Sequence, residues 1–161
     1  MALASGIAAS TAAAAADRLF AGGGWAALRF GARCEAVARP LPPASNREKQ
    51  ARAGFAFDPG ARRNGEFFAR LSRPARPGSS PILTIGSQPF LLVGRGAWVW
   101  SRGAQQDAAM IAAARGATSM RLEGRDPSGR RFTDRYLLDG APTAIDAAAA
   151  GCAILSRSGK I

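Results

Sequence analysis

The clearest pattern in the chain is the alternation of apolar and polar positions in residues 119–125 and again in residues 130–138. Successive side chains of a strand point to opposite faces, so each run predicts a strand with one buried face. Met120 and Leu122 share the apolar side of the first run. The four residues between the runs read Asp-Pro-Ser-Gly, with the proline and glycine positions of a type I turn. We therefore predict an antiparallel hairpin.

Two other segments show helical spacing instead. In residues 105–115 the apolar positions form one stripe, and the glycine after Arg115 is typical of a helix end. In residues 141–153 the apolar stripe ends at Cys152, which predicts that this cysteine is buried. A helix with one apolar side needs a surface to cover, and a sheet provides it.

The rest of the chain consists mainly of short apolar or alternating runs separated by glycine and proline. We predict strands at residues 25–30, 33–39, 66–72, 81–85, 88–93 and 97–100, and a short strand at 55–57. The predicted fold class is therefore mainly β: an antiparallel β-sandwich or flattened barrel with two covering helices at about 105–115 and 141–153. Trp98 and Trp100 share one face, which we interpret as core filling. A sugar-binding aromatic shelf is the alternative.

The length of 161 residues fits one domain, which we place at residues 17–161. Residues 1–16 are small, uncharged and rich in alanine, and they end in a pattern typical of signal-peptidase sites before Asp17. We interpret them as the remnant of a signal peptide whose start lies upstream of Met1. A disordered or helical alanine-rich segment is the alternative. No segment is long and apolar enough to predict a membrane span.

The chain has two cysteines, Cys34 and Cys152, and each falls on a predicted inward-facing row. The two thiols are therefore placed to meet across the core. In an exported protein this placement predicts a disulfide. Two unpaired buried cysteines are the alternative.

The formal net charge of +11 favours acidic partners, although a coding bias towards arginine gives the same composition. Between residues 29 and 76, eleven basic side chains face four acidic ones. No aromatic platform is evident among these arginines, so a solvated rim is the simpler explanation. The candidate anion-binding residues in this region are Arg47, Lys49, Arg52, Arg62, Arg63, Arg70, Arg73 and Arg76.

The absence of histidine removes the commonest general base and most zinc sites. We therefore expect no catalytic residues, no metal site and no cofactor. Asp134 shares a row with aromatic residues, and we expect its carboxylate to accept hydrogen bonds or to pair with an arginine. A hydrolase built on paired carboxylates remains a weaker alternative.

Several motifs occur together in one order: an early Trp25 followed by a cysteine, the helix D-A-A-M-I-A-A-A-R-G, the strand S-M-R-L-E-G, and the run T-D-R-Y-L-L-D-G before the last helix. This order resembles the invasion-associated locus B family of exported bacterial proteins, over about residues 25–153. The resemblance implies a periplasmic or secreted β-sandwich-like domain without an assigned catalytic activity. The chain departs from the family in having Ala141-Pro142 where an aromatic residue commonly follows the glycine, and in its shortened leader.

Together, these features predict an exported protein, periplasmic or secreted, that serves in binding or structural support in the cell envelope. Its partner would be an unidentified protein or an anionic envelope component. The alternative is a nucleic-acid-binding protein that uses residues 29–76. The sequence does not predict an oligomeric state.

Overall fold

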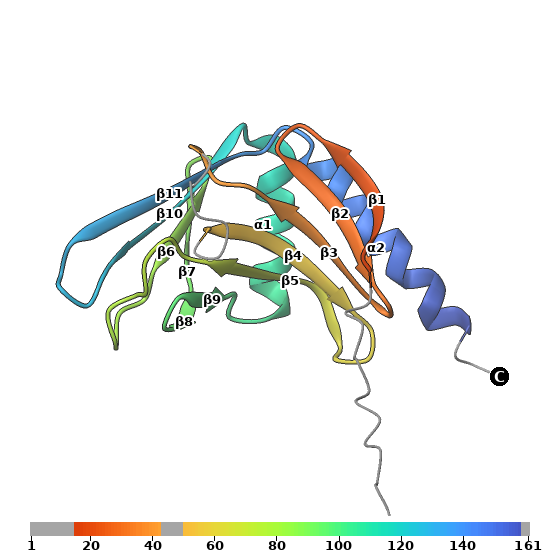
Figure 1. Ribbon diagram of the computed structural model, residues 1–161, viewed down its shortest axis with the longest axis horizontal. Helices are drawn as coiled ribbons and strands as arrows, with labels where there is room; N and C mark the ends of the chain where they lie inside the picture. Colours follow the sequence, from red (N-terminus) through yellow and green to blue (C-terminus); the bar gives the residue numbers. More distant parts are fainter. Residues whose placement is uncertain (1–14, 43–49, 159–161) are drawn as a thin grey trace, which may run out of the picture.

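The computed structural model describes residues 15–42 and 50–158, and within them it contains two antiparallel sheets and two helices (Figure 1). Sheet A has seven strands in the order β1-β2-β3-β4-β5-β9-β8, and sheet B has four in the order β11-β10-β6-β7. The elements are β1 Asp17–Gly22, β2 Trp25–Phe30, β3 Arg33–Ala38, β4 Arg52–Asp58, β5 Arg63–Arg70, β6 Ile82–Ile85, β7 Gln88–Leu91, β8 Val93–Arg95, β9 Trp98–Trp100, α1 Ala104–Gly116, β10 Ser119–Arg125, β11 Arg131–Leu137 and α2 Ala141–Ser158.

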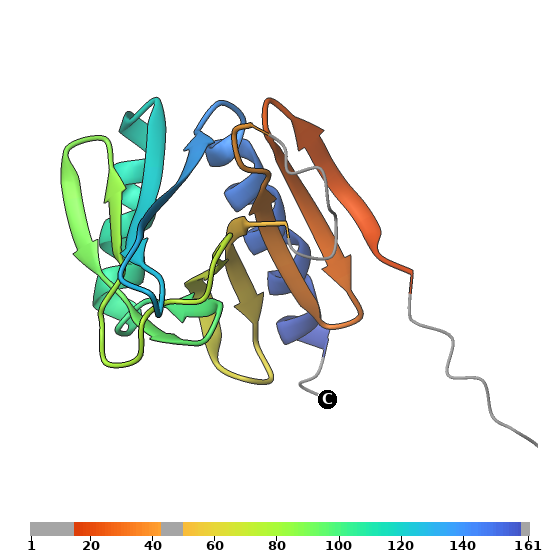
Figure 2. The same ribbon diagram turned by 60° about the vertical axis from the view of Figure 1, so that its left-hand side comes forward.

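The two sheets pack together as a sandwich, which confirms the predicted fold class, whereas the flattened-barrel alternative is wrong because neither sheet closes on itself. Both helices lie on one side of sheet A (Figures 1 and 2). Helix α2 contacts β1 to β5, and α1 contacts β5 together with β6 and β7 of the other sheet. Helix α1 therefore bridges the two sheets, and the buried residues of both sheets and both helices form one cluster.

The centre of the core is aromatic. Phe55 on β4 is fully buried, and its ring lies 6.3 Å from that of Trp25 and 5.5 Å from that of Phe67, measured between centroids. The Trp25 indole also reaches sheet B, because its Nε1 donates a 2.8 Å hydrogen bond to the carbonyl of Leu137. Aromatic packing and one polar contact thus join the two sheets.

Two buried carboxylates hold neighbouring segments together. Asp107, in the first turn of α1, accepts a 3.0 Å hydrogen bond from the backbone N–H of Phe67 on β5. Asp134 on β11 accepts a 2.9 Å bond from the N–H of Ser72. Burial raises the pKa of Asp134, and the bond from Ser72 opposes this shift. The expectation that Asp134 accepts hydrogen bonds is confirmed.

The predicted hairpin is present as β10 and β11, with Met120 opposite Tyr136 and Leu122 opposite Asp134. Its turn forms the expected hydrogen bond from the N–H of Gly129 to the carbonyl of Asp126, at 2.8 Å. The hairpin extends to one side of the molecule, away from β1 (Figure 1).

Several elements of the structure differ from the sequence-based prediction. Residues 17–22 form an edge strand, β1, that the alternation did not reveal, and the glycines after it make the turn into β2. The short strand expected at 55–57 is the seven-residue β4 in the middle of sheet A. Residues 93–95 form β8 rather than part of a turn. Helix α2 continues to Ser158, five residues beyond its predicted end at 153.

The interpretation of Trp98 and Trp100 as core residues is wrong. Val99 is the residue of β9 that points into the core, where it is fully buried opposite Ala69. Because neighbouring side chains of a strand face opposite ways, both indoles lie on the outer face of sheet A, where they are half-buried. The two-residue spacing of the tryptophans predicts that they share one face of the strand, but it does not say whether that face is the inner or the outer one.

Cys34 and Cys152 form a disulfide with 5.8 Å between their Cα atoms, which confirms the predicted pairing. Cys34 lies on the inner face of β3, and Cys152 lies on the buried stripe of α2. The sheet and the last helix approach closely here: a Cβ atom added to Gly151 would stand 2.5 Å from the Leu19 side chain. The bond therefore fixes α2 to sheet A.

Replacing both cysteines by alanine is expected to lower the free energy of unfolding by roughly 4 to 5 kcal/mol, because the disulfide closes a span of 118 residues. Urea denaturation of the wild type and of the C34A/C152A variant measures this difference. A reducing agent should destabilise the wild type and leave the variant unchanged, which serves as the control. Intact-mass analysis without reductant should give a wild-type mass that is lower than that of the reduced protein by two hydrogen atoms. Reactive thiols at both positions in the unreduced protein would contradict the pairing.

Candidate functional site

The eight basic residues proposed from the sequence do not gather in one place. Arg52 and Arg70 lie opposite each other on neighbouring strands of sheet A. Arg62 and Arg63 lie at the turn between β4 and β5, where they line a cleft of about 720 Å³. The sequence brought these four residues into one region, but the structure separates them into two.

Two more of the eight, Arg73 and Arg76, follow β5 and lie near the β10–β11 hairpin. Arg73 pairs with Asp126, and the N–H of Arg76 donates to the carbonyl of Arg125 at 2.7 Å. Arg47 and Lys49 lie outside the described residues.

The cleft at the β4–β5 turn carries no excess of positive charge. Arg63 pairs with Glu66 at 3.6 Å, and Arg115 of α1 pairs with Asp146 of α2. The latter pairing raises the pKa of Arg115 and lowers that of Asp146 through a side-chain hydrogen bond. The acids in this cleft thus neutralise its arginines. The cleft is therefore a weaker candidate for an anion-binding site than the β10–β11 hairpin.

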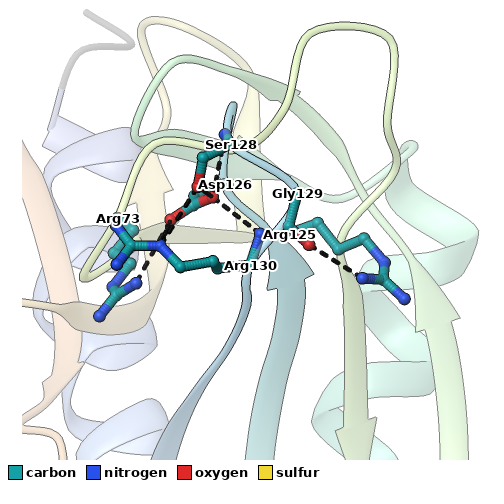
Figure 3. A network of polar contacts seen from close by, with 6 residues as sticks. All are labelled: Arg73, Arg125, Asp126, Ser128, Gly129 and Arg130. Carbon is teal, nitrogen blue, oxygen red and sulfur yellow. Dashed lines mark hydrogen bonds and ion pairs between the residues drawn. The ribbon is translucent and has the colours of Figure 1, made fainter.

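The tip of the β10–β11 hairpin is built around one carboxylate (Figure 3). Asp126 is only 4% exposed. Its Oδ1 accepts bonds from the N–H and hydroxyl of Ser128, at 3.0 and 2.6 Å, and from the N–H of Arg130 at 3.0 Å. Its Oδ2 lies 3.3 Å from Arg73 and 3.4 Å from Arg130. The hydrogen bond from Ser128 contributes most to lowering the pKa of Asp126 to about 2, and the Arg130 N–H and Arg73 act in the same direction.

The outward face of the same hairpin carries four exposed arginines, which we call the cationic face: Arg121, Arg125, Arg131 and Arg135. They form two directly opposed pairs, because Arg121 lies opposite Arg135 and Arg125 lies opposite Arg131. Like charges in directly opposed positions destabilise a strand pair. The arrangement therefore costs stability and favours an anionic partner.

Only part of this charge is compensated within the described chain. Arg121 pairs with Glu123 at 3.0 Å, and Arg125 donates to the carbonyl of Gly129 at 2.9 Å (Figure 3). Arg131 and Arg135 form no ion pair with any carboxylate of residues 15–42 or 50–158. These two side chains are the best placed to bind an external anion.

Apolar side chains share this face of sheet B with the arginines. Leu137 of β11 is 49% exposed, Leu91 of β7 is 48% exposed, and Ile82 of β6 is 38% exposed. Ile82 lines a cleft of about 450 Å³ together with Arg76 and residues of the hairpin that include Arg125 and Arg131. The face therefore combines cationic and aliphatic surface.

The candidates proposed from the sequence end at Arg76 and include none of the cationic face. The signal was nevertheless present, since the alternation already put Arg121 and Arg125 outward on one strand. Five residues, 126–130, separate the two strands in the structure, and this register puts Arg131 directly across from Arg125 and Arg135 directly across from Arg121. Counting charges along the chain misses such a cluster, whereas pairing the residues across the turn reveals it.

Comparison with family models, with curated proteins and with solved structures found no match for this chain. Within the described residues, no helix combines the length and hydropathy of a membrane span. No group of three or more potential metal ligands occurs among those residues either.

We expect Asp126→Asn to lower the melting temperature at neutral pH, because the amide keeps the shape of the side chain but loses the charge that Arg73 and Arg130 bind. A folded-state pKa of about 2 lies below the ordinary aspartate value, so the charged form stabilises the fold above about pH 4. This contribution disappears as the pH falls through about 2. Melting curves between pH 2.5 and 7 should therefore show the wild type and the variant converging at low pH.

The matched control is Asp17→Asn, because Asp17 pairs with Arg29 on an exposed surface and exposed pairs contribute little. It should leave the melting temperature nearly unchanged. A difference between wild type and D126N that stays constant down to pH 2.5 would contradict the proposed role of the Asp126 charge.

Proposed function

We propose that this chain is an exported, non-catalytic binding protein of the cell envelope, which attaches through its cationic face to a surface rich in phosphate headgroups. The single observation that carries the proposal is the pair of directly opposed arginine pairs on an exposed sheet face. Arginine recognises phosphate by paired N–H donors, so phosphate is the chemistry that relieves the repulsion best.

The disulfide supports the location. Stable disulfides form in oxidising compartments and are rare in the reducing cytoplasm. The resemblance to the invasion-associated locus B family and the leader-like residues 1–16 point in the same direction. We therefore place the protein in the periplasm or outside the cell, as part of this proposal.

The exposed aliphatic side chains support a lipid surface over a small soluble anion. Ile82, Leu91 and Leu137 share the outer face of sheet B with the arginines. A cationic face with aliphatic residues matches a membrane surface, where headgroups meet arginines and apolar side chains reach the acyl boundary. Lysine is almost absent from the chain, so arginine carries nearly all of this interaction.

The test is binding to vesicles of phosphatidylglycerol and phosphatidylcholine, measured by co-sedimentation. We expect binding that increases with the phosphatidylglycerol fraction and weakens with salt, because screening shortens the range of the attraction. The variant R131Q/R135Q removes the two uncompensated arginines. Each arginine near an anionic surface contributes about 1 kcal/mol, so we expect roughly a thirtyfold loss of partitioning.

The matched control is R18Q/R39Q, which removes the same charge from exposed positions on sheet A and on the segment after β3. It should bind vesicles nearly as well as the wild type. Equal binding of the wild type to phosphatidylcholine vesicles, or an R131Q/R135Q variant that partitions like the wild type, would refute the proposal.

A further inference from the structure

A second arrangement of arginines lies on the outer face of sheet A, distant in sequence from the cationic face. Four residues on adjacent strands form one line across the sheet, which we call the arginine–tryptophan row: Arg52, Arg70, Trp98 and Arg95. Arg52 pairs with Arg70, Arg70 with Trp98, and Trp98 with Arg95 in the strand register. The row includes two of the basic residues proposed from the sequence, together with Trp98, an aromatic residue of a later strand that the sequence did not connect with them.

The guanidinium group of Arg52 is held by aromatic rings. It lies 5.2 Å from the centroid of the Trp98 ring and 5.9 Å from that of Phe68. Such stacking fixes the plane of the guanidinium and leaves its edge N–H groups free to bind an anion in a bidentate manner. The side chain is therefore oriented for binding before a ligand arrives.

Arg70 stands beside this oriented group with little compensation of its own. Its Nη1 donates a 3.4 Å bond to the carbonyl of Gln50, and within the described ranges no carboxylate pairs with Arg52, Arg70 or Arg95. Two opposed like charges on a strand pair are unfavourable. A carboxylate or sulfate between them would remove this repulsion and satisfy both groups.

The shape of the row indicates a polymer rather than a single small anion. Strands in a sheet lie about 4.8 Å apart, so a row across four strands spans about 14 Å, the length of about three sugar rings. The parallel row beside it contributes the half-buried Trp100 and the exposed Val93, whereas Phe68 in the same row is buried next to Arg52. A ligand on this face would thus meet guanidinium groups along one line and the side chains of Trp100 and Val93 along the next.

We propose that the arginine–tryptophan row binds an acidic polysaccharide, with carboxylates on Arg52, Arg70 and Arg95 and a sugar ring stacked on Trp100. Tryptophan offers a large flat face of this kind to a partner, whereas the arginines select for negative charge. Because Arg52 already covers one face of Trp98, the indole that is open to a sugar ring is that of Trp100 in the neighbouring row. Single-stranded nucleic acid instead needs several rings for successive bases, which favours the polysaccharide.

This inference shares with the proposed function the export of the protein, but it uses a different sheet and different residues. The probe is a galacturonate hexamer, with maltohexaose as its neutral counterpart, and binding is measured by isothermal titration calorimetry together with tryptophan fluorescence. We expect the wild type to bind the acidic hexamer and not the neutral one. The variant R52K/R70K keeps the net charge but loses the bidentate and stacked geometry, and it should bind at least about tenfold more weakly.

The control is R131K/R135K, which makes the same exchange at two exposed arginines of sheet B and should bind as the wild type does. Should R52K/R70K fail to fold, Arg95→Lys at the exposed end of the row gives the same test, with an expected loss of about threefold. A wild type that does not bind the galacturonate hexamer, or an R52K/R70K variant that binds it like the wild type, would overturn the proposal. So would tighter binding of a thymidine oligonucleotide at equal salt, which would assign the row to nucleic acid.

The outcome is independent of the vesicle experiment. The R131Q/R135Q variant should bind vesicles more weakly than the wild type but bind the galacturonate hexamer equally well. The R52K/R70K variant should bind vesicles like the wild type but bind the hexamer more weakly. A negative result for one face therefore does not contradict the proposal for the other.

Discussion

The structure depends on the contact between sheet A and helix α2, which the disulfide makes permanent. Cys34 comes from an early strand and Cys152 from the last helix, so the bond joins parts of the chain that are 118 residues apart. The start of α2 is fixed just as closely, since a Cβ atom on Gly140 would stand 2.2 Å from the carbonyl oxygen of Gly22. Its positive φ of 84° is a second reason for glycine there. Helix α2 is thus fixed to sheet A both near its start and at Cys152. The opposite face of sheet A is not covered by this helix.

One face of each sheet packs into the core, so the exposed arginines of both sheets lie on the opposite faces. At the hairpin tip, Asp126 compensates Arg73 and Arg130 and so contributes to folding. Arg131 and Arg135 on the outer face of sheet B form no ion pair with an acid of the described residues, and neither do Arg52 and Arg70 on sheet A. A high net charge alone is a weak argument for binding, because composition can produce it. What favours binding is that each of these arginines lies directly opposite another arginine on the neighbouring strand.

The sequence predicted those parts of the fold in which one local pattern decides the outcome. Alternation on both sides of a four-residue turn fixed the β10–β11 hairpin, and the apolar stripe that includes Cys152 identified the buried side of α2. It did not predict β1, whose Leu19 and Phe20 are adjacent rather than alternating and are both half-buried. The sequence also did not predict which way the side chains of Trp98 and Trp100 point, because a period of two residues does not say which face of a strand meets the core. That choice depends on the pairing of Val99 with Ala69, which lies thirty residues earlier. The arginine–tryptophan row combines four strands and could not be read from any single segment.

A chain with two cysteines has only one intramolecular pairing, so oxidation cannot produce a scrambled isomer of the monomer. The wide separation of Cys34 and Cys152 nevertheless sets an order of events during biogenesis. Cys34 is synthesised 118 residues before Cys152 and has no intramolecular partner until the last helix has been made. The errors open to it in that interval are intermolecular, and they end when the last helix arrives and buries both sulfur atoms.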